Sequence, residues 1–164
     1  MAPKLEHAFT MRGYISKENS MDLGAMKQGP TRIIVPISHG FVRGSGLEAT
    51  IAPGGGDWIL FDSTTNYFHL DVRTQARTKD GDSVYIHYTG ILGMDEAAKK
   101  VLGWSKDAKT TSYGDHQWFT GPIMEMSSAD FKWVETTLFV GQGHFVVEGE
   151  AVSAVEYEIY KVVN

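Results

Sequence analysis

Side chains able to exchange protons alternate along one stretch of the chain that predicts a β-strand. His69, Asp71 and Arg73 occupy every second position, so a strand would place all three on one face. Asp80-Gly81 between two β-rich runs predicts a hairpin, and a two-residue loop would bring Tyr88 opposite Arg73 on that face. Lining a cavity, these groups could transfer protons and stabilise an oxyanion. Two alternatives stay open: on a solvent-facing strand Asp71 and Arg73 would be ordinary surface charges, and a one-residue bulge would exchange the cross-strand partners.

Two further carboxylates are candidate acids. Asp57 follows Gly54–Gly56, in a stretch predicted to be a turn, and precedes Trp58, a candidate substrate contact. The Asp57 side chain could act as an acid or simply cap the turn. Glu125 stands between two methionines on a predicted strand, where alternation places it on the exposed face. If Glu125 points inward instead, desolvation raises its pKa and suits it to donate a proton.

Histidines and aromatic residues supply candidate contacts for a substrate. His39, His69 and His87 are alternative proton carriers, because histidine titrates near neutral pH. Trp118 and Phe119 could wall a pocket for a planar ligand, although such residues most often form core. The six histidines lack metal-site spacing and cysteine is absent, so no metal site is predicted. Since no nucleophile elbow, phosphate loop or dinucleotide fingerprint is present either, we expect no cofactor.

The pattern of the whole chain predicts an all-β, mainly antiparallel fold. About ten short β-rich stretches are separated by turns roughly every 8–12 residues, which is typical of a barrel or sandwich. We expect one β-barrel domain over residues 1–164, because closure removes exposed strand edges. One short helix is expected over Asp95–Leu102, capped by Asp95 and followed by Gly103. Residues 16–30 are expected to form a loop or lid.

The composition limits the partners that the chain could bind. Fifteen Lys and Arg against twenty Asp and Glu give a net charge of −5, which argues against nucleic acid, because phosphate contacts need a basic face. No stretch approaches the ~20 apolar residues that cross a bilayer, and the first residues lack the apolar run of a secretory signal. We therefore expect a cytoplasmic protein that binds a small apolar or aromatic molecule inside its barrel. A homodimer is expected only because two-fold pairs are common.

Five short motifs follow one another along the chain: Pro36-Ile37-Ser38-His39-Gly40, Ala52-Pro53-Gly54-Gly55-Gly56-Asp57-Trp58, Leu70-Asp71-Val72-Arg73, Asp80-Gly81 with Val84-Tyr85-Ile86, and Phe139-Val140-Gly141-Gln142-Gly143. In this order the chain resembles the DUF3237 family, also called UPF0311, from about Leu5 to Val163. The resemblance implies a compact antiparallel β-barrel, and it favours a pocket location for Asp57, Trp58, Asp71 and Arg73. The chain departs from the family pattern at His39, at Phe61 and around Glu125, which implies a more apolar and individually tuned cavity.

Three classes of function follow from these residues and from the resemblance. Some fungal relatives of the family are linked to tailoring of aromatic polyketides, including ring closure by adding a hydroxyl across an alkene. The first hypothesis is therefore a cofactor-independent cyclase or isomerase that uses acid–base catalysis on an aromatic polyketide-type molecule. Lyase or hydrolase chemistry would use the same groups. The alternative is a non-catalytic barrel that binds an apolar metabolite, and a structural module is the weakest of the three.

Overall fold

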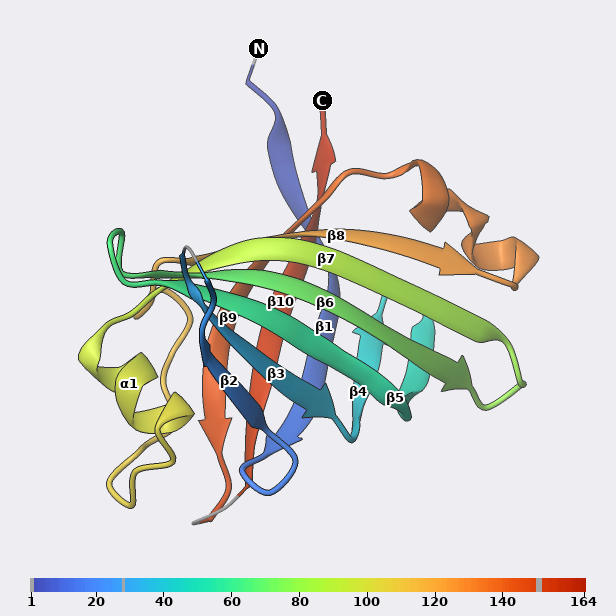
Figure 1. Cartoon of the computed structure of the whole chain (residues 1–164). Coiled ribbons are helices and arrows are strands. Elements are labelled where there is room, and N and C mark those ends of the chain that lie inside the picture. Colours follow the sequence, from blue (N-terminus) through green and yellow to red (C-terminus); the bar gives the residue numbers. More distant parts are fainter. Residues whose placement is uncertain (1, 28, 150–151) are drawn as a thin grey trace.

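The computed structural model describes residues 2–27, 29–149 and 152–164 of the chain. Within them lie ten strands, one α-helix and one 3-10 helix (Figure 1). In chain order these are β1 Lys4–Ser16, β2 Met21–Ala25, β3 Thr31–Ile37, β4 His39–Gly44, β5 Leu47–Asp62, β6 Tyr67–Thr78, β7 Ser83–Gly93, α1 Glu96–Leu102, β8 Trp118–Met126, η1 Ala129–Thr136, β9 Phe139–Val147 and β10 Val152–Val163. The prediction of an all-β fold with one short α-helix is confirmed.

Eight of the described strands close into an antiparallel barrel. Around the ring the order is β5-β4-β1-β10-β9-β8-β7-β6, and pairing of β6 with β5 completes it. Strands β2 and β3 lie beside this ring as a hairpin, in which β3 pairs with residues 55–61 of β5. Because each strand of the ring has a neighbour on both sides, the barrel solves the edge problem that led us to expect closure.

Strand β5 changes neighbour partway along its length. Its first part pairs with β4 and its second part with β3, while the pairing with β6 contains a bulge between Ala52 and Gly56. Gly55 permits this close packing, because a Cβ there would lie 2.6 Å from the carbonyl oxygen of Arg73 and 2.8 Å from Cα of Thr74. The predicted turn over residues 53–57 is therefore wrong: the glycine-rich stretch is a bulge inside one long strand.

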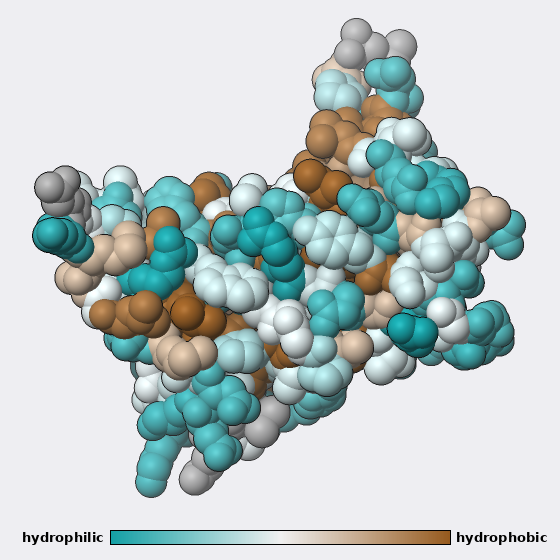
Figure 2. Space-filling view, turned by 45° about the vertical axis from the view of Figure 1, so that its right-hand side comes forward, coloured by the Kyte–Doolittle hydropathy of each residue, from teal (hydrophilic) through white to brown (hydrophobic). Residues whose placement is uncertain are grey.

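Inward-facing side chains fill the barrel with apolar groups. Strand β8 alternates strictly: every second residue from Trp118 to Met126 is buried, and the residues between them are exposed. The largest fully buried side chains are Trp118, Tyr88, Tyr157, Phe9, Phe68, Phe139 and Phe145. The outer surface, by contrast, mixes hydrophilic and hydrophobic residues (Figure 2). The interior is thus a water-poor environment in which any charged group is destabilised.

Segments outside the ring partly match their predictions. The helix α1 has Asp95 as its N-cap, whose carboxylate accepts the Ala98 N–H at 2.8 Å, and Gly103 follows its last residue. The expected loop over residues 16–30 is wrong in part, because Met21–Ala25 forms β2 and pairs with β3. None of the helices in the described residues has the length and apolar character needed to cross a bilayer.

The bulge in β5 leads to the first prediction. Gly55→Ala should lower the free energy of unfolding by about 1–3 kcal/mol, because the added methyl group overlaps backbone atoms of β6. Urea denaturation monitored by circular dichroism measures this change. Gly121→Ala in β8 is the matched control, since a Cβ at Gly121 would meet no atom within 4 Å. Equal stabilities of the two variants would contradict the role given to Gly55.

Candidate functional site

The barrel contains a small inner cavity that opens into a larger mouth. The inner cavity has a volume of about 30 Å³, which is room for about one water molecule. The mouth has a volume of about 320 Å³ and includes Lys17 and Trp104 at its rim. Five apolar side chains line both spaces: Ile15, Val35, Ile59, Phe68 and Leu102. The two spaces therefore form one funnel, and residues of β2, β3 and the end of α1 line its mouth.

Among the described residues, Asp57 brings the one carboxyl group into the lining of the inner cavity. It lies opposite Val72 in β6 and Val35 in β3, both of which are buried. Its Oδ1 accepts the backbone N–H of Asp71 at 3.0 Å. Burial raises the pKa of Asp57 to about 7, and the negative charge of Asp71 adds to this rise. The hydrogen bond from the Asp71 backbone N–H and the positive charge of Arg32 oppose it. Near neutral pH both the acid and the base form of Asp57 are populated.

Two buried tyrosines face the same cavity as Asp57. Tyr88 and Tyr157 are each about 2% exposed, and their rings meet edge to face at 5.3 Å between centroids. Burial raises the pKa of Tyr88 above its usual range, and the charge of Asp57 raises it further. The pKa of Tyr157 is raised by burial, by Tyr88 and by Asp57. Both phenols therefore stay neutral and can donate hydrogen bonds, while Asp57 is the group that exchanges protons.

Trp118 completes the polar end of the cavity. Its side chain is 1% exposed, and its ring packs against Tyr157 and Phe145 at centroid distances of 5.3 and 4.6 Å. Gly143 in β9 makes room for it, because a Cβ there would lie 2.6 Å from the indole and 2.9 Å from the ring of Tyr157. Among the described residues, the indole Nε1 has no hydrogen-bond partner. The Tyr157 hydroxyl lies near this N–H, which opposes part of the rise in the pKa of Tyr157. The two groups do not, however, meet the distance and angle of a hydrogen bond.

The register of β6 and β7 explains why Tyr88 lies inside. Arg73 pairs with His87, and Val72 pairs with Tyr88, because the connection is wider than a two-residue loop: Thr78 N–H bonds to Asp82 O at 3.0 Å. The predicted pairing of Arg73 with Tyr88 is therefore wrong by one residue. Compared with the prediction, that shift moves every side chain of β7 to the opposite face. Tyr88 therefore lies on the inner face with Asp57 and not on the outer face with Arg73.

Asp71, Arg73 and His87 form a cluster on the outer face of the barrel. The Asp71 carboxylate lies 3.2 Å from Arg73 Nη1 and 3.2 Å from His87 Nε2. The Asp71 and Arg73 side chains are 41% and 51% exposed, so the alternative of ordinary surface charges describes them. Asp71 still touches the site through its backbone N–H and its charge.

The other predicted site residues lie on the outer surface as well. Glu125 is exposed on β8, as simple alternation indicated. His39 is exposed and stacks on Tyr14 with 4.4 Å between ring centroids. The remaining three are exposed outward-facing residues of β5, β6 and β8, namely Trp58, His69 and Phe119. Of the eleven predicted residues, the structure brings Asp57, Tyr88 and Trp118 together at the cavity.

Sequence reasoning missed Tyr157 as a member of the site. The alternation of Val155, Tyr157 and Ile159 with Glu156 and Glu158 predicts a strand with one dry face. Tyr157 stands on the dry face, and a phenol on such a face is a buried polar group that needs a partner. That signal could have identified it.

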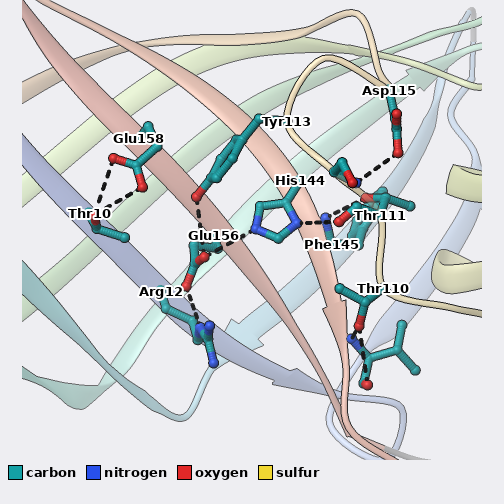
Figure 3. A network of polar contacts seen from close by, with 12 residues as sticks. Thr10, Arg12, Thr110, Thr111, Tyr113, Asp115, His144, Phe145, Glu156 and Glu158 are labelled. Atoms are coloured by element: carbon teal, nitrogen blue, oxygen red, sulfur yellow. Dashed lines mark hydrogen bonds and ion pairs between the residues drawn. The ribbon is translucent and has the colours of Figure 1, made fainter. Parts of the chain in front are cut away.

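A polar network on the outer wall anchors the segment that frames the mouth (Figure 3). His144 Nδ1 donates to Thr111 O at 2.8 Å, and His144 Nε2 lies 3.1 Å from Glu156 Oε1. Arg12 Nε donates to Glu156 Oε2 at 2.5 Å, and Tyr113 donates to Oε1 at 3.2 Å. These bonds fasten the chain between α1 and β8 to β1, β9 and β10. The residues of this network therefore support the mouth and do not line the inner cavity.

The buried His116 ties the same segment to α1. Its Nδ1 lies 2.6 Å from Asp95 Oδ2 and its Nε2 lies 3.0 Å from Thr111 Oγ1. The helix that ends at Leu102, a residue of the mouth, is thereby fixed at its first turn. In the part of the chain that the structure describes, no three His, Asp or Glu side chains are grouped so that they could hold a metal ion.

A closed antiparallel barrel with an apolar funnel that ends at a buried carboxyl and two phenols defines a class of small β-barrels with an interior cavity. The chain belongs to the DUF3237 family, whose model, described as "Protein of unknown function (DUF3237)", matches residues 3–162. The UPF0311 protein RPA1785 of Rhodopseudomonas palustris is 30% identical over 145 residues, which cover 86% of this chain and 89% of that protein. Its crystal structure aligns with a TM-score of 0.82 at 21% identity over 99% of each chain.

Two fungal proteins are more distant relatives in sequence or fold. The PR-toxin biosynthesis cluster protein 7 of Penicillium roqueforti is 22% identical over 133 residues, which cover 78% of this chain and 71% of that protein. A crystal structure described as an enzyme from Penicillium herquei aligns with a TM-score of 0.59 at 12% identity, over 96% of each chain. The fold of this chain is thus also found in a protein that is described as an enzyme.

The raised pKa of Asp57 leads to the second prediction. Below about pH 4 the carboxyl is protonated in both the folded and the unfolded chain; between about pH 4 and 7 only the unfolded chain loses the proton. This group therefore lowers the free energy of unfolding as pH rises through that window, by up to roughly 3–4 kcal/mol. Asp57→Asn removes the titration, so the variant should gain stability over the wild type between pH 4 and pH 8.

Urea denaturation of both proteins at a series of pH values measures this difference. Taking the difference cancels the other carboxylates, such as Asp107, whose pKa is lowered by its bond to Lys100. Asp80→Asn, in the exposed turn between β6 and β7, is the control and should follow the wild type throughout. A constant difference between Asp57→Asn and the wild type from pH 4 to 8 would show that Asp57 titrates at its ordinary pKa.

Proposed function

We propose that this protein is a cofactor-independent enzyme that cyclises or isomerises a small, largely apolar aromatic molecule by acid–base catalysis. One observation carries the proposal: at the inner end of an apolar funnel, burial brings the pKa of the Asp57 carboxyl to about 7, beside two phenols that stay neutral. A group that is half protonated near neutral pH is suited to give a proton and to take one back.

Addition of a hydroxyl to an alkene within one molecule illustrates the chemistry. Protonated Asp57 gives its proton to one alkene carbon, and the π electrons form the new C–H bond. The substrate's own hydroxyl oxygen supplies the electron pair of the new C–O bond to the other carbon, and its proton passes to the Asp57 carboxylate. No atom is lost, the substrate is neither oxidised nor reduced overall, and Asp57 ends in the form in which it began.

The funnel contributes by holding the substrate in a reactive shape. Well-oriented intramolecular reactions gain up to ~7–11 kcal/mol from proximity and orientation, and each positioned proton transfer adds about 10²–10⁴-fold. The apolar walls around Asp57, among them Ile59 and Leu70, keep bulk water away from a cationic or polarised intermediate. Tyr88 and Tyr157 donate hydrogen bonds to oxygen without competing for the proton.

The comparisons support an enzyme over the other classes. A fungal relative carries the name of a toxin biosynthesis cluster, and a protein with the same fold is described as an enzyme. We extend this to aromatic polyketide-type substrates because of the association of fungal relatives with such tailoring reactions. The runner-up is a carrier that binds the same kind of molecule in the funnel and leaves it unchanged.

The third prediction tests the proposal with ortho-prenylphenol, whose hydroxyl can add to its alkene to give a dimethylchroman. The wild type should form this ring with no added cofactor, and in D₂O the product should carry one deuterium on carbon, because the new C–H bond takes its hydrogen from Asp57. The rate should fall as pH rises above about 7, where Asp57 loses its proton. Mass spectrometry and proton NMR measure the product.

Substitution of Asp57 separates an enzyme from a carrier. Asp57→Asn should slow ring closure by at least about 10²-fold while ortho-prenylphenol still binds, as measured by calorimetry. Asp80→Asn, outside the funnel, should keep full activity. Binding by the wild type with no turnover of this probe or of a panel of alkenyl phenols and ketones would favour the carrier.

A further inference from the structure

We infer that the inner cavity is a binding site for a single neutral oxygen atom of the substrate, which accepts a hydrogen bond from the indole N–H of Trp118. The ligand class is then aromatic ketones and phenols, with the oxygen buried and the ring system in the mouth. This inference rests on the proposed function in that it names the substrate class of the same funnel. Its basis is Trp118, which the proposed mechanism does not use.

The first observation is the unsatisfied N–H itself. Trp118 is 1% exposed, lines the inner cavity, and its Nε1 lacks a hydrogen-bond partner among the described residues. Buried polar groups are nearly always hydrogen-bonded, because leaving one unpaired costs free energy. An indole N–H can only donate. The missing partner is therefore an acceptor, and carbonyl or hydroxyl oxygen is the common acceptor in small molecules.

The second observation is that Trp118 has no room to turn away. Its ring is packed between Tyr157 and Phe145, and it fills the space that Gly143 leaves open. The same ring also meets His116 at 6.1 Å between centroids. A donor fixed by packing on several sides is preorganised for one position of the acceptor. Binding of an oxygen there needs no rearrangement of the wall.

The third observation is the size of the two spaces. The inner cavity of about 30 Å³ accepts one water-sized group, whereas the mouth of about 320 Å³ accepts a ring system. An oxygen substituent on an aromatic ring has this shape, with one small polar atom at the end of a broad apolar body. A carbonyl oxygen can take over the hydrogen bond of a water molecule from the same place, which keeps the bond and gains the contacts of the rings.

The charges around the cavity select neutral oxygen over a carboxylate. Asp57 lines the same cavity, and its negative charge is strong enough there to raise the pKa of both Tyr88 and Tyr157. A second carboxylate would be repelled by that charge, and no Lys or Arg side chain lines the inner cavity among the described residues. Ketones and phenols are therefore favoured over aromatic acids.

The fourth prediction uses α-tetralone and tetralin, two ring systems that differ by one carbonyl oxygen. The wild type should bind α-tetralone about tenfold more tightly than tetralin, the difference of about one hydrogen bond. Replacing Trp118 by benzothienylalanine, which exchanges the N–H for sulfur and keeps the ring shape, should remove this preference and leave tetralin affinity unchanged. The same replacement at Trp133, which packs on Phe9 outside the funnel, should change neither. Titration calorimetry measures the affinities of all three proteins for both compounds.

A second readout needs no substitution at the site. The four tryptophans give four indole N–H signals in a ¹H–¹⁵N spectrum, and the spectrum of Trp118→Phe assigns the one that belongs to Trp118. Addition of α-tetralone should move that signal downfield, as expected for a new hydrogen bond, and tetralin should not. Equal binding of both compounds by the wild type, or no difference between their effects on the Trp118 signal, overturns the inference.

The outcomes separate this inference from the proposed function. Asp57→Asn should keep the preference for α-tetralone, because the oxygen is held by Trp118. If the preference for α-tetralone depends on Trp118 but the protein turns over no probe, the oxygen site stands and the proposed enzyme activity is contradicted. Turnover of ortho-prenylphenol without any preference for the ketone would do the reverse.

Discussion

The burial of the Asp57 carboxyl inside a closed barrel is the constraint on which the site depends. A carboxylate in a water-poor interior is destabilised relative to the neutral acid, and here a single backbone N–H, that of Asp71, offsets part of the cost. The same closure keeps Tyr88 and Tyr157 neutral. If the ring of strands were open, water would solvate all three groups, and their properties would return to those of exposed side chains.

Strand β5 links this constraint to the sequence. Its bulge at residues 52–56 lets one strand pair with β4, β3 and β6, and Gly55 removes the Cβ that would strike β6. Odd-numbered residues of β5 face inward on both sides of the bulge, and Asp57, two places after Gly55, therefore points inward beside Val35 and Val72. The glycine-rich stretch therefore lies within one long strand and not in a turn, and the same strand carries the candidate catalytic group.

The sequence predicted the architecture better than the faces of the strands. Alternation, the Asp80-Gly81 hairpin and the capped helix were enough for an antiparallel barrel with one helix, because these signals are local. The side on which Tyr88 lies depends on the width of a turn, and a difference of one residue reversed it. The inner face of β6 was easier to predict, because the apolar Leu70 and Val72 alternate with Asp71 and Arg73 and are buried. Only the family resemblance favoured a pocket location for the two charged residues.

The cost of burying Asp57 is itself an argument about function. A barrel that only carries an apolar molecule gains nothing from a carboxyl whose ionisation opposes folding near neutral pH, and an apolar residue at that place would stabilise it. Proteins retain such destabilising groups where activity needs them. The same holds for the unpaired N–H of Trp118, which a phenylalanine would avoid. Asp57 is only partly compensated and the Trp118 N–H is unpaired, so both groups are unfavourable for stability at the end of one apolar funnel. The proposed substrate would answer both, because it brings an oxygen to Trp118 and a proton-accepting carbon to Asp57.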